Sequence, residues 1–199
     1  NEEAWVNEGL SNLAEELNGY PNGYAAARFA AQPNIALLSW GLDPDQMHAH
    51  YGGPELLARY LAQRYGLGAL AELVREPLNG IAGWEATLQR LDPEMTFDAF
   101  YADWLVSLAL GAPYAANSDL LDEWLPPSLT CQPVMAYPAL AEGELAPYGT
   151  ACWSLGRGEG REISLALEGQ AEASLVATEP PSGEWVWWSN RGDRGHSGL

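Results

Sequence analysis

No lysine occurs among the 199 residues of this chain, so its nine basic side chains other than histidine are all arginines. The 27 acidic residues outnumber them and give a formal net charge of −18 at pH 7. A field of that sign repels phosphate backbones and disfavours nucleic-acid binding. No apolar run approaches the roughly 18 residues that a membrane-spanning helix needs. An apolar fraction of 47% is typical of a globular protein with one large or two small domains.

Histidine is also scarce and occurs only at positions 48, 50 and 196. No pair of these residues forms H-E-x-x-H, the arrangement that supplies two zinc ligands and a general base. A catalytic zinc ion usually needs three protein ligands and a water. The sequence also lacks a glycine-rich phosphate loop and a serine nucleophile elbow. These 199 residues alone therefore contain no complete catalytic centre of these kinds.

Cys131 and Cys152 are the two cysteines of the chain. They lack C-x-x-C spacing and a nearby histidine, so metal binding is disfavoured. They are consistent with one disulfide that closes a loop of about 20 residues and stabilises the fold by about 3 kcal/mol. Two buried free thiols are the alternative.

Apolar residues recur every three or four positions from Trp5 to Leu17, and this spacing predicts an amphipathic helix. Glu8 lies near its start and shares a face with Asn12. Such a helix could hold one carboxylate rigidly beside a metal ion, with Asn7 and Asn12 available to orient it by hydrogen bonds. A purely structural interpretation is that the Glu8 carboxylate interacts with the positive end of the helix dipole.

Turn-forming residues over 18–23 end this helix. Residues 24–45 have no clear period and predict a long irregular connection with room for one short helix. Helical spacing returns further on and predicts helices over 53–65, 67–75, 81–91 and 97–108. The last of these begins after the capping residue Thr96 and carries a broad aromatic stripe, which we interpret as a face buried in the core.

The composition changes after Gly111, where repeated prolines exclude long helices. Alternating apolar and polar residues predict strands over 151–155, 163–168, 173–176 and 184–189. The sequence thus predicts an α+β protein with a helical part over 1–112, a Pro-rich connection over 113–147 and a β-rich part over 148–199.

Two segments resemble one known family. The run W-V-N-E-G-L-S-x-L-A-E from Trp5 is similar to the glutamate helix of gluzincins, especially the secreted immune inhibitor A-like and hyicolysin-like metallopeptidases. The run W-W-S-N-R-G-D from Trp187 resembles part of the β-sandwich domain that follows the protease in that family. His50-Tyr51-Gly52 and the helix spacing between these runs also follow it, so the resemblance covers nearly the whole chain.

In that family the glutamate of Asn-Glu-Gly completes a zinc site begun by an H-E-x-x-H helix earlier in the chain, so the resemblance implies that Glu8 is the third zinc ligand. Tyr51 occupies the position of the side chain that hydrogen-bonds the oxyanion, with His50 or His48 as alternates. Many relatives carry an acid where Asn12 stands, which leaves the orienting role of Asn12 open. An extracellular location favours the disulfide between Cys131 and Cys152.

The resemblance therefore implies the helical C-terminal lobe of a zincin-like fold, followed by the start of a β-sandwich-like domain, in a secreted zinc endopeptidase that hydrolyses protein or peptide substrates through a metal-bound water. Because the sequence opens at Asn1 without the H-E-x-x-H helix, we expect an internal fragment that is inactive alone and needs the upstream part of the same protein. The alternative is a non-catalytic extracellular protein- or glycan-binding module, a pseudo-peptidase. An H-E-x-x-H about 20 residues before Glu8 would select the enzyme.

Overall fold

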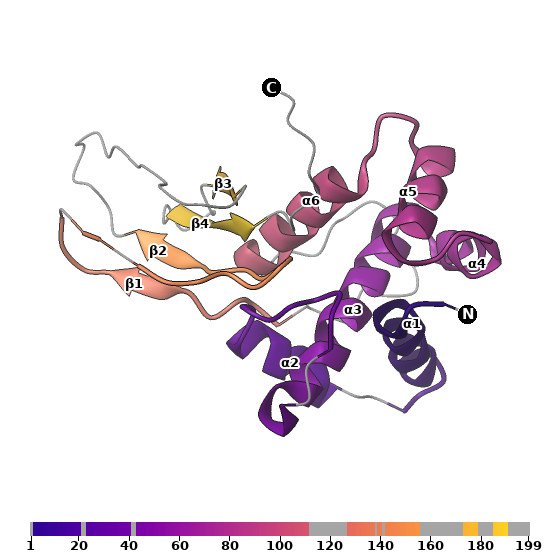
Figure 1. Ribbon diagram of the computed structural model, residues 1–199, viewed down its shortest axis with the longest axis horizontal. Helices are drawn as coiled ribbons and strands as arrows, with labels where there is room; N and C mark the ends of the chain where they lie inside the picture. Colours follow the sequence, from indigo (N-terminus) through magenta and orange to yellow (C-terminus); the bar gives the residue numbers. More distant parts are fainter. Residues whose placement is uncertain are drawn as a thin grey trace.

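The computed structural model describes residues 2–20, 23–40, 43–111, 127–137, 139–140 and 142–155, together with the backbone of two later strands. The described part is α+β and mostly helical, as the sequence predicts (Figure 1). Its helices are α1 (Ala4–Leu17), α2 (Gly23–Ala31), α3 (Pro44–Tyr65), α4 (Leu67–Arg75), α5 (Gly80–Leu91) and α6 (Phe97–Leu110). Its strands are β1 (Gln132–Val134), β2 (Trp153–Leu155), β3 (Ala173–Thr178) and β4 (Trp185–Asn190).

Helix α3 begins nine residues before the position that the sequence predicts, at Pro44 instead of Gly53. Pro44 occupies the first turn, and the Asp43 carboxylate caps it by accepting a hydrogen bond from the Asp45 backbone N–H at 3.0 Å. Pro54 marks the interior of the helix instead of its start. The prediction of the start was wrong because proline suits a first turn, whereas here packing against neighbouring helices keeps the helix continuous around it.

Helices α1 and α2 pack closely against the middle of α3, where small residues allow backbones to approach. A Cβ atom at Gly52 would collide with the backbone of Ala25 in α2. On α1, a Cβ atom at Gly9 would lie 2.6 Å from the Cβ of Pro54. Helix α2 falls in the segment that the sequence predicts to be largely irregular, and it buries four small or aromatic side chains, Ala25, Ala26, Phe29 and Ala30.

An aromatic core joins α1 to α5 and α6. The Trp5 ring stacks on Trp84 with a centroid distance of 6.0 Å, and both rings also contact Phe97. The aromatic stripe of α6 is buried, which confirms that it is a core face: Phe97, Phe100, Tyr101, Trp104, Leu105 and Leu108. Thr96 caps this helix by accepting a hydrogen bond from the Ala99 backbone N–H at 3.1 Å. Trp5 therefore fixes the start of α1 against the rest of the bundle.

The four strands form one sheet in the order β1-β2-β4-β3, in which β1 and β2 are parallel and the other pairs antiparallel. Strand β1 falls within the segment assigned from sequence to a Pro-rich connection, and the strand predicted over 163–168 lies outside the described residues. A disulfide joins Cys131 to Cys152 with a Cα–Cα distance of 4.5 Å. It lies directly before the register pair Gln132 and Trp153 of β1 and β2.

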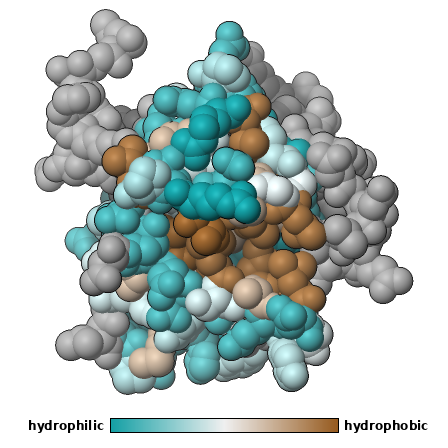
Figure 2. Space-filling model, turned by 90° about the vertical axis from the view of Figure 1, so that its right-hand side faces the viewer, coloured by the Kyte–Doolittle hydropathy of each residue, from teal (hydrophilic) through white to brown (hydrophobic). Residues whose placement is uncertain are grey.

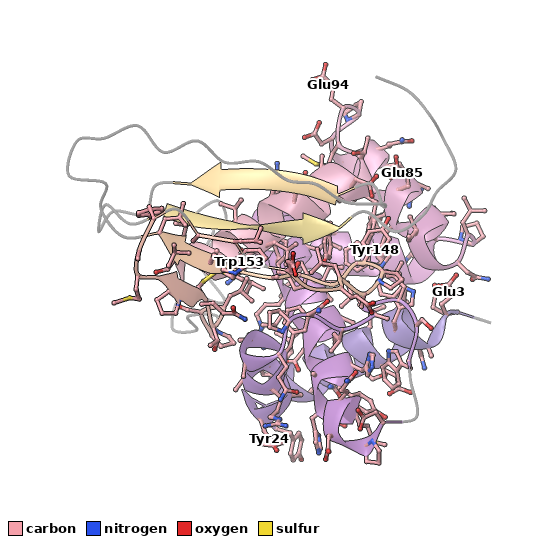
Figure 3. All side chains as sticks on the ribbon, turned by 60° about the vertical axis from the view of Figure 1, so that its left-hand side comes forward. Glu3, Tyr24, Glu85, Glu94, Tyr148 and Trp153 are labelled. Carbon is pink, nitrogen blue, oxygen red and sulfur yellow. A yellow bond between two sulfur atoms is a disulfide. The ribbon has the colours of Figure 1, made fainter. Side chains whose placement is uncertain are left out.

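The segment that leads into β2 is attached to the helices by Tyr148, which Figure 3 shows between the strands and the helical bundle. The Tyr101 hydroxyl of α6 donates to the Tyr148 carbonyl at 2.5 Å, and the Tyr148 hydroxyl donates to Asp98 at 3.0 Å. Leu129, Tyr148 and Cys152 belong to the same hydrophobic core as the helices. Within the described residues, no helix combines the length and the apolarity needed to cross a membrane.

The contact between Gly9 and Pro54 leaves no room for a side chain, so we expect Gly9→Ala to lower the free energy of unfolding by about 1–3 kcal/mol through overpacking. Gly68 is the matched control because it lies in α4 with no atom within 4 Å of an added Cβ, and Gly68→Ala should be neutral or stabilise by up to about 1 kcal/mol. Urea denaturation followed by circular dichroism measures both. A G9A variant as stable as the parent chain would contradict the close packing of α1 on α3.

Candidate functional site

Helix α1 packs against the middle of α3. Gly9 contacts Pro54, and Glu16, about two turns further along α1, forms an ion pair with Arg59, further along α3. Glu8 lies about 100° around α1 from Gly9. Asn12, one turn after Glu8, is buried, and the charge of Glu15 acts on Glu55 of α3.

We call seven polar residues of these two helices the polar seam. It consists of four side chains of α1 and three of α3: Glu8, Asn12, Glu15, Glu16, Tyr51, Glu55 and Arg59. The charge of Glu15 on α1 raises the pKa of Glu55 on α3, so these two carboxyl groups of the polar seam interact between the helices. Helix spacing places the predicted ligand Glu8 one turn before Asn12 on α1, and the predicted oxyanion donor Tyr51 one turn before Glu55 on α3.

The side chains of the polar seam differ in burial. Asn12 is 7% exposed and Glu55 0% exposed, whereas Glu8 and Tyr51 are partly buried. Asn7 is exposed and points away from α3. The Asn12 Nδ2 donor and the Glu55 Oε2 acceptor have no hydrogen-bond partner within the described part of the chain. A buried polar group without a partner costs about 1–3 kcal/mol, so each atom is a candidate to bind something further.

The polar seam carries an excess of negative charge. Its four carboxylates face one guanidinium, that of Arg59, which pairs with Glu16 and lies 3.5 Å from the Glu55 Oε1 atom. Burial lowers the pKa of Arg59 to about 10, so it keeps its charge at neutral pH. Burial and then the charge of Glu15 raise the pKa of Glu55 to about 7. Such an environment favours a bound cation near the remaining carboxylates.

The two histidines near Tyr51 have other surroundings. His50 is 2% exposed, and its ring lies 6.0 Å from Trp40. Burial lowers the pKa of His50, although a hydrogen bond with the Ala36 backbone and the charge of Asp43 oppose this. His48 is exposed, and its ring packs edge-on against Tyr24 at 4.9 Å.

Tyr51 is therefore the member of this group that helix spacing places on the polar seam, one turn before Glu55. Its ring packs edge-on against Trp40 at 4.5 Å, which restricts its orientation. His50 is one residue earlier, about 100° around the helix, and lies among Trp40 and the Ala36 backbone.

Sequence analysis did not single out Glu16, Glu55 or Arg59. The available signal was the spacing of Glu55 and Arg59, a charged pair at i and i+4 that flanks the buried run Leu56-Leu57-Ala58. Such pairs are common on exposed helix faces, and only the position of α1 shows that this one is buried.

A complete metal site is absent from the described residues, which contain no group of three or more histidine, cysteine, aspartate or glutamate side chains placed to hold an ion. No protein-family model matches the sequence, and no curated protein matches it. The functional assignment therefore depends on the polar seam and on the motifs that resemble the gluzincin family.

The raised pKa of Glu55 makes the stability of the fold depend on pH. Because its pKa is about 7 in the folded chain and 4.5 ordinarily, its contribution is fully present below about pH 4.5 and is lost as the pH rises through 7. Glu55→Gln mimics the protonated side chain. We expect E55Q to match the parent chain near pH 4.5 and to be more stable by about 1–3 kcal/mol at pH 8.

Denaturation of both proteins at a series of pH values measures this difference, and the other acidic groups cancel in the comparison. Glu15→Gln removes the second cause of the pKa shift, so it should shift the pH dependence of the wild-type stability to lower pH. A stability difference between E55Q and the parent chain that is constant from pH 4.5 to 8 would contradict the pKa assignment.

Proposed function

We propose that this chain is the helical lobe that supplies a zinc ligand, Glu8, to a secreted zinc-dependent endopeptidase. The observation that carries the proposal is the polar seam, where the partly buried Glu8 lies one turn before the buried Asn12 on α1. The remaining ligands and the general base would come from residues outside these 199. When bound, zinc would act as a Lewis acid toward a peptide carbonyl and activate water.

The residues present fit such a metal. Glu8 offers an oxygen ligand of a type that zinc accepts. Asn12 lies one helical turn after Glu8 and has an unpartnered Nδ2 donor, as judged from the described residues. A donor in that position can orient a ligating carboxylate, as hydrogen bonds commonly do around metal ligands. The excess of carboxylates in the polar seam attracts a divalent cation.

Tyr51 would stabilise the oxyanion that develops on the substrate carbonyl by donating its phenolic O–H. The edge-on contact with Trp40 restricts the ring before substrate binds, and a donor fixed in advance is what this kind of stabilisation needs. Asn12 and Glu55 are less suited than Tyr51 to contact the substrate, because both are more deeply buried.

A second candidate function is a non-catalytic extracellular binding module. It is favoured by apolar side chains on the surface. Figure 2 shows the face that carries α1, α4 and α5, where hydrophobic atoms gather from the middle toward the right and hydrophilic atoms lie above, to the left and below them. Leu17 of α1 is 44% exposed, Val74 of α4 67% and Leu78, which follows α4, 51%. Apolar surface with a polar rim is typical of protein-binding faces.

The proposal predicts that the full translated product of the gene binds zinc and hydrolyses casein in a chelator-sensitive reaction, whereas residues 1–199 alone do not. Glu8→Ala in the full product should lower zinc affinity by at least about 100-fold and abolish hydrolysis, because a three-ligand site loses one ligand. Glu72→Gln is the matched control, since Glu72 is exposed on α4. Zinc retained by E8A, or a full product without zinc-dependent hydrolysis, would reject the enzyme and leave the binding module.

Tyr51→Phe removes the phenolic O–H and keeps the ring against Trp40. If Tyr51 donates to the oxyanion, Y51F should lower kcat of the full product by about 100-fold and leave KM and zinc content nearly unchanged. Tyr24→Phe is the control, because Tyr24 is an exposed tyrosine that packs against His48. A full kcat in Y51F would assign the role to another group.

A further inference from the structure

Arg59 is an unusual residue for the interior of a helical bundle. It lies in the middle of α3, is 2% exposed, and is surrounded along its helix by buried apolar residues. Its guanidinium forms an ion pair with Glu16 of α1 and lies 3.5 Å from Glu55 of its own helix. Burying such a pair has a desolvation penalty that often equals the attraction between the charges, so stability alone is a weak reason for it.

The ion pair gives α1 a second point of attachment to α3. The first point is steric, where Gly9 lies against Pro54 with no space for a side chain. Buried Trp5, Val6 and Leu13 also hold the apolar face of α1 against the core. The pair between Glu16 and Arg59, about two turns after Gly9, adds a directional contact near the end of α1, because it joins two named side chains.

The rotation of α1 decides where Glu8 points. Glu8 and Asn12 lie beside the line of contact with α3, so a turn of about 50° moves their side-chain ends by about 5 Å on a helix whose radius with side chains is 5–6 Å. That displacement would take a carboxylate out of bonding distance of a metal ion held elsewhere.

We propose that Arg59 is a positioning residue: by pairing with Glu16 near the end of α1 it completes the constraint on the rotation of this helix, and thereby on the direction in which Glu8 and Asn12 face. The effect of Arg59 on zinc binding rests on the proposed function, whereas its effect on the position of α1 does not. Arg59 itself acts through Glu16 and contacts neither substrate nor metal in this scheme.

The first test measures the position of α1 in residues 1–199. Spin labels on cysteines introduced at Ser11 of α1 and Gln46 of α3, both exposed, report the distance between the helices by pulsed electron spin resonance. The native cysteines are joined in a disulfide and do not react with the label. We expect a narrow distribution in the labelled parent and in Arg59→Lys, which keeps the charge. In Arg59→Met the distribution should broaden or shift by about 3–5 Å.

A second variant separates positioning from stability. R59M alone leaves Glu16 partly buried without its cation and is expected to lower the denaturation midpoint. The double variant E16M/R59M replaces the ion pair by apolar side chains and should recover the midpoint of the parent. If it also recovers the narrow distance distribution, Arg59 has no positioning role. If the midpoint recovers and the distribution stays broad or shifted, the inference is supported.

The last measurement uses the full translated product. E16M/R59M should lower zinc affinity by about 10-fold or more and lower kcat more than KM, while R59K retains most of both. Unchanged zinc affinity and kcat in E16M/R59M would overturn the link between Arg59 and Glu8. If the parent full product shows no zinc binding at all, the proposed function fails, and the spin-label distances still decide whether Arg59 positions α1.

Discussion

The contact between α1 and α3 determines how the remaining parts of this molecule are arranged. It combines a steric limit, where Gly9 meets Pro54, with a buried charge pair, where Glu16 meets Arg59. Both act together with the buried apolar face of α1, which includes Val6 and Leu13. Together they place the polar residues of α1 beside those of α3, and the aromatic contact of Trp5 with Trp84 holds the start of α1 against α5.

Charge in the polar seam is balanced by protonation as well as by pairing. One arginine cannot neutralise four nearby carboxylates, and Glu55, the one that is fully removed from water, responds with a pKa raised to about 7. Glu8 remains partly exposed. The interior therefore keeps its own charges nearly balanced at neutral pH.

Most of the helices could be predicted from the sequence, because α1, α4, α5 and α6 carry large apolar residues at helical spacing. The first half of α3 and all of α2 could not. Gly52 and Pro54 resemble a helix start locally, and the Ala-rich α2 has few large apolar residues, so the stability of both depends on contacts made across the bundle. The motif around Glu8 predicted a site from the sequence. The role of Arg59 could not be predicted, because its ion pair with Glu16 depends on how α1 packs against α3.

Two interpretations of α1 differ in how they explain Asn12, whose buried Nδ2 donor has no partner among the described residues. In one interpretation α1 helps to hold a ligand, and in the other it is only structural. A carboxylate near a helix start is explained well enough by the helix dipole, so Glu8 alone favours neither interpretation. A helix that only needed to pack would place an apolar residue at position 12, because a buried amide without a partner lowers stability. Asn12 lies one turn after Glu8 on the same side of α1. Its amide is unfavourable while it has no partner, and a hydrogen bond to a carboxylate held in a fixed orientation would remove this energetic cost. The burial of Asn12 therefore supports the proposed metal-binding role of α1 more strongly than the motif does.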